Sequence, residues 1–242
     1  MSSFQAEAAG EPLRLYVVTE PIRPGSEQYT EQLGEAIGTL FSRYDFSITG
    51  NMTRALRAAH DHLREWNRTS MPEEQVGAGV SLLALREDVG YLAQAGPSVA
   101  IYGDGARAQR FSPANGSLQE SVGLASELRP SITRFELGLG ESVLLSGSAL
   151  RAALQDEHGP ALLGMDPEEA LGQVYVMLKE QPNLGAILIS HVASGALHPS
   201  ALPGEAYPST GPDTEIIDDT LYEAPAERGG PEPSSSRDPF AR

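Results

Sequence analysis

The sequence predicts an α+β fold in which helices and mainly antiparallel strands form separate layers of a sandwich. Two segments with apolar residues at helical spacing come first, a run of strand-like segments separated by short turns follows, and a helix and a strand close the series. Because a doubly wound parallel sheet would alternate strands and helices one by one, this order favours the layered sandwich. An apolar content of 40% is enough to fill a sizeable core.

The first third of the chain predicts one strand and two helices. Residues 13–18, Leu-Arg-Leu-Tyr-Val-Val, have the composition of a strand. Ser26 is placed to cap the first helix, with Glu27 in its first turn. Apolar stripes define the two helices, at Leu33, Ile37, Leu40, Phe41 and Tyr44 in the first and at Met52, Leu56, Ala59, Leu63 and Trp66 in the second. His60 and His62 point in different directions on the second helix, which predicts a solvated surface rather than a metal site.

The middle of the chain is rich in strands. They are predicted at residues 76–86, 90–95, 98–102, 108–112, 132–137 and 142–146. A turn at Gly96-Pro97-Ser98 predicts that residues 89–102 form one hairpin, Asp104-Gly105 predicts a second, and residues 138–141 predict a third. Gly77 and Gly79 lie within a predicted strand and lack the Lys-Ser/Thr of a phosphate loop, so they indicate close backbone packing.

A helix and a strand are predicted to close the domain. Residues 149–154 begin a short helix. Asp166 then provides a cap, Pro167 fills the first helical position, and two glutamates follow in the first turn, which together are a strong helix start. Residues 186–190, Ala-Ile-Leu-Ile-Ser, predict the closing strand.

We therefore expect one domain at residues 13–192, a flexible N-terminus at 1–12 and a disordered acidic tail at 193–242. The tail is dense in Pro, Gly, Ser and acidic residues, and its apolar residues are too few to offset the entropy of ordering it. One apolar island in the tail is a candidate protein-docking motif, made of Ile216, Ile217, Leu221 and Tyr222. The alternative is a linker with incidental apolar residues.

Composition excludes several classes of partner. A formal net charge of −16 disfavours binding to nucleic acid or to anionic lipid, so we expect a protein partner. The sequence has no apolar run of about 18 residues and no secretory signal, which predicts neither a membrane segment nor export. The absence of cysteine excludes disulfides and thiolate metal sites, and we expect a cytoplasmic protein. The single lysine, Lys179, among many arginines suggests a GC-rich bacterial source.

Residues 13–192 resemble the metal-dependent serine/threonine phosphatases of type 2C, the PPM family. The similarity lies in the order and spacing of four segments: the Gly-rich strand 76–85, the hairpin 89–102, the hairpin 135–146 and the strand that follows Gln181-Pro-Asn. This resemblance implies an α-β-β-α four-layer sandwich of two mainly antiparallel sheets flanked by helices. It also implies that an active site would lie at one end of the two sheets.

The resemblance weakens at the residues that would carry the chemistry. In the family, two Mg²⁺ or Mn²⁺ ions activate a bridging water that attacks a phosphate, and such hard cations need several carboxylates. Glu20 alone retains a carboxylate at a family metal position, whereas Pro97, Ser148 and Pro182 stand where the family has Asp. The resemblance thus implies no catalytic residue and no Mn²⁺ or Mg²⁺ site in this chain. The alternative is that the correspondence has slipped and that other carboxylates serve.

Three function classes remain open on the basis of the sequence. The first is a catalytically inactive type 2C-like domain, a pseudophosphatase that binds a partner in bacterial signalling. The second is an active Mn²⁺- or Mg²⁺-dependent protein serine/threonine phosphatase with a rearranged site. The third is a structural or assembly module that has only inherited the fold, since a fold does not fix a function. The missing carboxylates favour the first.

Overall fold

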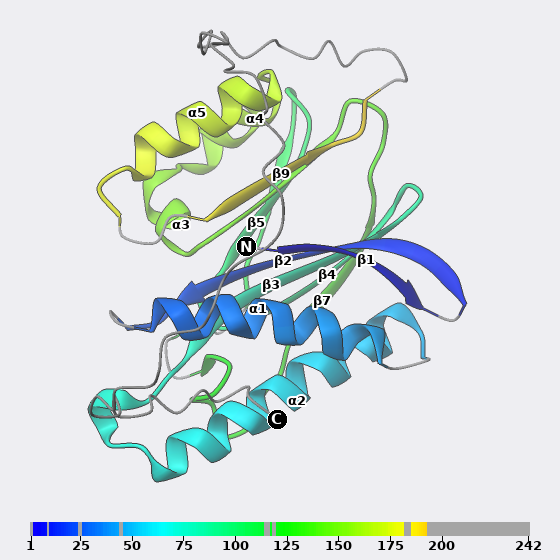
Figure 1. The fold of residues 1–242 in the computed structure, drawn as a ribbon. Helices are drawn as coiled ribbons and strands as arrows, with labels where there is room; N and C mark the ends of the chain where they lie inside the picture. Colours follow the sequence, from blue (N-terminus) through cyan, green and yellow to red (C-terminus); the bar gives the residue numbers. More distant parts are fainter. Residues whose placement is uncertain are drawn as a thin grey trace, which may run out of the picture.

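A computed structural model describes residues 2–8, 10–23, 26–43, 46–113, 117, 120–181 and 185–192. Within these residues the chain forms two antiparallel sheets packed face to face, with helices on both outer faces (Figure 1). In that view, helices α1 and α2 lie below one sheet and α3, α4 and α5 lie above the other. The predicted α-β-β-α sandwich is confirmed.

Sheet A has five strands in the order β1-β2-β3-β4-β7, and each pairs antiparallel with its neighbour. Its strands are β1 (Ser2–Ala8), β2 (Glu11–Pro21), β3 (Ala78–Arg86), β4 (Val89–Ala95) and β7 (Ser131–Glu136). Strand β1 corrects the expectation of a flexible segment at residues 1–12. Ala6 and Ala8 are buried in the core, and the Phe4 ring packs against Gly38. Small Ser and Ala side chains make the alternation of this strand too weak to detect in the sequence.

Sheet B has four strands in the order β6-β5-β8-β9. They are β5 (Val99–Gly103), β6 (Ala108–Phe111), β8 (Ser142–Ser146) and β9 (Ala186–Ser190). The predicted hairpin of β5 and β6 is confirmed, with the Asp104 side chain accepting hydrogen bonds from the N–H groups of Ala106 and Arg107.

Two other predicted hairpins are wrong. Strand β4 pairs with β3 and β7 in sheet A, whereas β5 pairs with β6 and β8 in sheet B, so the turn at Gly96-Pro97-Ser98 crosses between the sheets. The connection at residues 138–141 likewise leaves β7 in sheet A and enters β8 in sheet B. Turn residues in a sequence are equally compatible with a hairpin and with a connection that crosses from one sheet to the other. Which strands pair is decided by packing between segments that are far apart in the sequence.

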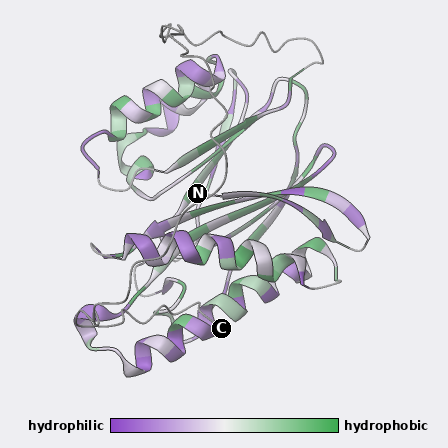
Figure 2. Cartoon of the chain, viewed as in Figure 1, coloured by the Kyte–Doolittle hydropathy of each residue, from purple (hydrophilic) through white to green (hydrophobic). Residues whose placement is uncertain are grey.

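Helices α1 (Glu27–Ser42) and α2 (Ile48–Thr69) cover sheet A through a core of aliphatic side chains. Ser47 caps α2 by accepting a hydrogen bond from the Gly50 N–H. Ser26 occupies the N-cap position of α1 as predicted, but its hydroxyl does not cap the helix and donates instead to the Arg23 carbonyl oxygen. Figure 2 shows hydrophobic residues along many strands of both sheets, whereas the helices carry hydrophobic and hydrophilic residues side by side.

Sheet B is covered by α3 (Ala149–Ala153), α4 (Gly159–Leu163) and α5 (Pro167–Leu178). The predicted start of α5 is confirmed, with the Asp166 side chain accepting from the Glu168 N–H. Between the sheets lies a third core that includes Val18, Leu83, Leu92, Phe135 and Leu145. No helix among the described residues combines the length and the apolar character that crossing a membrane requires.

His60 is buried, which corrects the expectation of a solvated histidine on α2. Its side chain is 3% exposed, and Nδ1 accepts a hydrogen bond of 3.0 Å from the Gly123 N–H. Within the described residues Nε2 is buried without a hydrogen-bond partner. Burial lowers the pKa of His60 below its ordinary 6.5, an effect that Asp61 opposes and Arg64 reinforces. His62, by contrast, is exposed as predicted.

We expect His60 to make the fold less stable in mild acid. Because the pKa of His60 is lower in the folded state, the unfolded chain binds more protons in mild acid. The stability that comes from keeping His60 neutral is therefore fully present above pH 6.5 and is lost as the pH falls toward the lowered pKa. Urea unfolding of the wild type and His60→Gln from pH 8 to 5 measures this. The wild type should lose more free energy of unfolding over that range than the variant, and parallel profiles would contradict the expectation.

Candidate functional site

A cavity of about 230 Å³ opens at the end of the two sheets where β2 and β8 finish. Its lining includes Glu20 and Pro21 from the end of β2, Ser146 and Gly147 from the end of β8, and Gln181 beyond α5. We call it the Glu20 cavity. This is the end of the sandwich at which the sequence resemblance places an active site.

Glu20 is held across the sandwich by Ser148. The Ser148 N–H donates to Glu20 Oε2 and the Ser148 hydroxyl donates to Oε1, both at 2.7 Å. Gly147 leaves space for this approach, because a Cβ there would lie 3.1 Å from the Glu20 carboxyl carbon and would push the carboxylate away slightly. Both carboxylate oxygens are therefore engaged by one residue at the start of α3, which ties sheet A to sheet B.

Burial dominates the electrostatics of Glu20. It raises the pKa of the carboxyl above the ordinary value of 4.5, while the two hydrogen bonds from Ser148 lower it and offset part of the effect. Because both of its oxygens accept hydrogen bonds from Ser148, Glu20 acts as an internal hydrogen-bond acceptor.

We expect Ser148→Ala to raise the pKa of Glu20 further and to lower the free energy of unfolding by about 1 kcal/mol, since it removes one donor to a partly buried carboxylate. The carboxyl ¹³C shift of Glu20 followed against pH measures the first effect, and urea unfolding measures the second. Ser131→Ala, at an exposed position in β7, is the control. An unchanged titration of Glu20 would contradict a bond between the two side chains in solution.

The structure brings together three of the four residues at family metal positions. Glu20 meets Ser148 directly, and Glu20 is the cross-strand partner of Gly79, over which the Pro97 carbonyl oxygen packs. The close packing predicted for Gly79 is thereby confirmed. Pro182, the fourth position, lies outside the described residues, as do the candidate docking residues Ile216, Ile217, Leu221 and Tyr222.

The side chains that the structure describes around Glu20 do not fit a pair of Mg²⁺ or Mn²⁺ ions. Across the described ranges there is no group of three or more His, Asp or Glu side chains placed to hold a metal ion. The described lining of the Glu20 cavity includes two carboxylates, Glu20 and Glu27, and both oxygens of Glu20 accept hydrogen bonds from Ser148. Two hard cations require several carboxylate and water ligands, and a proline at position 97 supplies no side-chain ligand.

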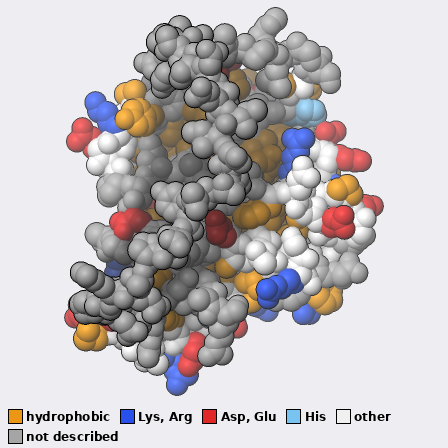
Figure 3. Space-filling model, in the orientation of Figure 1, with side chains coloured by type: hydrophobic (Ala, Val, Ile, Leu, Met, Phe, Trp, Pro, Cys, Tyr) orange, Lys and Arg blue, Asp and Glu red, His pale blue; other side chains and the backbone are white. Residues whose placement is uncertain are grey.

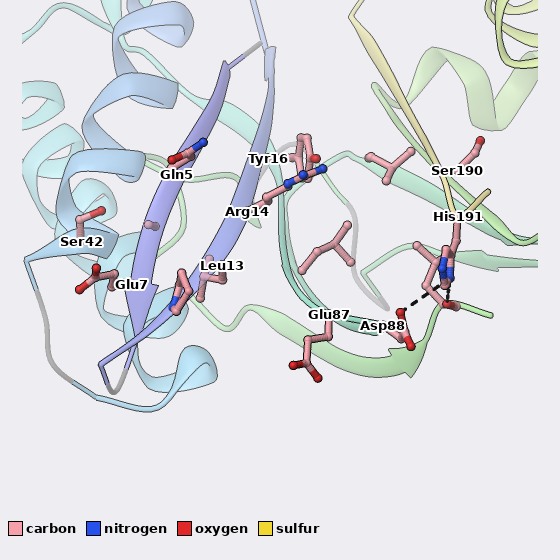
Figure 4. A pocket seen from close by; sticks show the side chains of 15 residues that line it. Gln5, Glu7, Leu13, Arg14, Tyr16, Ser42, Glu87, Asp88, Ser190 and His191 are labelled. Carbon is pink, nitrogen blue, oxygen red and sulfur yellow. Dashed lines mark hydrogen bonds and ion pairs between the residues drawn. The ribbon is translucent and has the colours of Figure 1, made fainter. Parts of the chain in front are cut away.

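A second and larger cavity, of about 900 Å³, was not predicted from the sequence. It lies where β1 and β2 face the end of β9, and its labelled side chains in Figure 4 include Gln5, Arg14, Asp88 and His191. Arg14 has the sequence context of an ordinary surface charge. These residues come from separate strands and turns, so no local pattern connects them.

Comparison of the fold with solved structures finds bacterial phosphatases. The sequence itself matches no protein-family model and no curated protein. The S. agalactiae serine/threonine phosphatase superimposes with a TM-score of 0.64 at 14% identity, over 78% of this chain and 91% of that one. The PPM Ser-Thr phosphatase MsPP from Mycobacterium smegmatis gives 0.60 at 15% identity, over 74% and 88%.

A third similar structure is that of PppA. PppA, described as a key regulatory component of T6SS in Pseudomonas aeruginosa, gives a TM-score of 0.58 at 18% identity, over 72% of this chain and 84% of that one. At such identities the likeness concerns the arrangement of the backbone. This chain has the fold of the bacterial PPM-type serine/threonine phosphatases.

Proposed function

We propose that this chain is a non-catalytic PPM-type domain, a pseudophosphatase that binds a partner protein and acts as a regulatory module. The observation that carries the proposal is the state of Glu20. The one carboxylate retained at a family metal position is bonded at both oxygens by Ser148. A side chain engaged in this way serves as a link between the two sheets, at the place where the family would bring metal ions.

A regulatory role fits the neighbours of the fold. The structurally similar PppA is described as a regulatory component of a secretion system, although that description applies to PppA alone. The acidic, cysteine-free sequence suits a cytoplasmic domain that recognises proteins rather than nucleic acid or anionic lipid. The role that we propose is therefore one in bacterial signalling.

Metal titration is the first test. We expect no saturable rise in melting temperature and no calorimetric binding with Mn²⁺ or Mg²⁺ up to millimolar concentration. A ligand that binds only the folded state would add about 2.7 kcal/mol at a hundred times its dissociation constant, which a melting scan detects easily. A clear, saturable shift would contradict the proposal.

Turnover of phosphopeptides with Mn²⁺ is the second test, and we expect none above background. Pro97→Asp alone should not create activity. Ser148 would still hydrogen-bond to both oxygens of Glu20, and it would still stand at a position where the family has Asp. Glu20→Ala and the exposed-residue control Glu73→Ala should then be equally inactive. Metal-dependent turnover that Glu20→Ala abolishes and Glu73→Ala preserves would establish the active-phosphatase alternative instead.

A further inference from the structure

Within the described part of the chain, strand β9 is an open edge of sheet B. It pairs with β8 on one side, and within the described residues no strand pairs with its other side. Its sequence, Ala-Ile-Leu-Ile-Ser, has high strand propensity and no charge or proline, and all five residues are partly exposed. Natural proteins usually blunt such edges with charges, prolines or bulges because they pair readily with another chain.

The backbone groups that face the open side of β9 can be identified. His191 directs both its N–H and its carbonyl oxygen toward the β8 side, to the Glu141 carbonyl oxygen at 2.9 Å and the Gly140 N–H at 2.8 Å. In an antiparallel ladder alternate residues bond to the same neighbour. The N–H and C=O groups of Ala186, Leu188 and Ser190 therefore face the open side.

The described residues leave space beside the end of β9, in the cavity that β1 and β2 of sheet A line together with Ile189, Ser190 and His191. In this part of the chain sheet A has five strands and sheet B has four. Strands β1 and β2 carry the cross-strand pair Gln5 and Arg14, and the 900 Å³ cavity lies between this pair and the end of β9. Figure 4 shows the lining side chains, with Gln5 and Arg14 on β1 and β2 and with Ser190 and His191 at the end of β9. We call the open edge of β9 and this cavity the β9 groove.

The charge of the β9 groove selects its occupant. Among the described residues that line it, Glu7, Glu87 and Asp88 carry carboxylates, against one arginine, Arg14. Figure 3 shows hydrophobic side chains in the middle of one face of the molecule and several acidic side chains along its right-hand edge. A net charge of −16 also disfavours a second copy of the chain, and the tail at 193–242 is itself acidic. A segment with cationic side chains is the complementary partner.

We propose that the β9 groove binds an extended, basic segment of a partner protein, which adds to sheet B as a strand beside β9. Main-chain hydrogen bonds to Ala186, Leu188 and Ser190 would hold the segment, and Lys or Arg side chains would meet the carboxylates of the groove. The biological purpose of this binding rests on the proposed regulatory function, whereas the binding itself does not. The metal and turnover assays test that role, whereas the exchange of the β9 amides tests the groove alone.

The probe is an acetylated and amidated peptide, Lys-Val-Thr-Val-Lys-Val-Thr, added to the full ¹⁵N-labelled chain and followed by amide hydrogen exchange. We expect binding to slow exchange at the amides of Leu188 and Ser190 at least tenfold. The amides of Ile187 and Ile189 should change less, because they are already bonded to β8. The same peptide with Glu in place of Lys should bind at least tenfold more weakly in low salt. Failure of the Lys peptide to bind, or equal binding of the two peptides, would overturn the proposal.

Charge reversal in the groove provides the matched variants. Glu7→Lys/Glu87→Lys/Asp88→Lys should reverse the preference between the two peptides, whereas the control Glu31→Lys/Glu73→Lys/Glu157→Lys, at exposed positions outside the groove, should preserve it. The exchange experiment on the wild type does not depend on these variants. If a variant fails to fold, the wild-type result with the Lys and Glu peptides still decides the question. Tighter binding of a peptide copy of residues 212–224, or a dimer that protects the same amides, would assign the groove to another occupant and refute the proposal.

Discussion

Replacing Asn67 with alanine is expected to lower the free energy of unfolding by about 3–5 kcal/mol, a large share of the 5–15 kcal/mol that holds a typical domain. Asn67 lies near the end of α2 with its side chain buried. Its Nδ2 donates to the carbonyl oxygens of Val76 and Gly123 at 2.7 and 2.9 Å, and its Oδ1 accepts from the Val76 N–H at 2.8 Å. Alanine would leave three buried backbone groups without partners.

Urea unfolding measures this loss, with Arg68→Ala as the control on the next residue. Arg68 is exposed and forms an exposed ion pair with Glu65, its one ion-pair partner among the described residues, so its removal should change the free energy of unfolding by less than about 0.5 kcal/mol. The same network explains why the loop at Gly123 packs on α2, since the Gly123 N–H donates to His60. If Asn67→Ala lowers the free energy of unfolding by less than about 1 kcal/mol, water must replace the hydrogen bonds of the Asn67 side-chain amide.

Most helices and strands could be predicted from the sequence because their signals are local. Periods of 3.6 and 2 identified α1, α2, α5 and the strands from β2 to β9, and the Asp166-Pro167 start of α5 was correct. Strand β1 was missed because Ser and Ala side chains give a weak alternation. The hairpins at residues 89–102 and 132–146 were wrong because the choice of pairing partner depends on packing between distant segments.

The candidate site could be predicted only in part. The resemblance to PPM phosphatases indicated Glu20, Pro97 and Ser148 as positions of interest, but the contact between Glu20 and Ser148 spans 128 residues of sequence. No local pattern could show that the Ser148 N–H and hydroxyl both reach the carboxylate. His60 was misjudged for the same reason, because the polar face of α2 is buried there by the loop at Gly123.

The second large effect is expected at Gly79, beside Glu20. A Cβ on Gly79 would overlap the carbonyl oxygen of Pro97, so Gly79→Ala requires the crossing between β4 and β5 to shift. The overlap is with backbone on both sides, and no side-chain rotation can relieve it. We expect a loss of about 3 kcal/mol or more in the free energy of unfolding, at the upper end of the cost of overpacking a core.

Gly172→Ala is the matched control for Gly79→Ala. Gly172 lies on the exposed side of α5, and a Cβ there would meet no atom within 4 Å. Alanine should therefore stabilise that helix by about 0.5–1 kcal/mol, the usual difference between the two residues in a helix interior. Thermal and urea unfolding should show a lower free energy of unfolding than the wild type for Gly79→Ala and a higher one for Gly172→Ala. Equal stability of Gly79→Ala and the wild type would mean that the Pro97 turn does not rest on β3, and that this end of the sandwich is open enough to rearrange around a ligand.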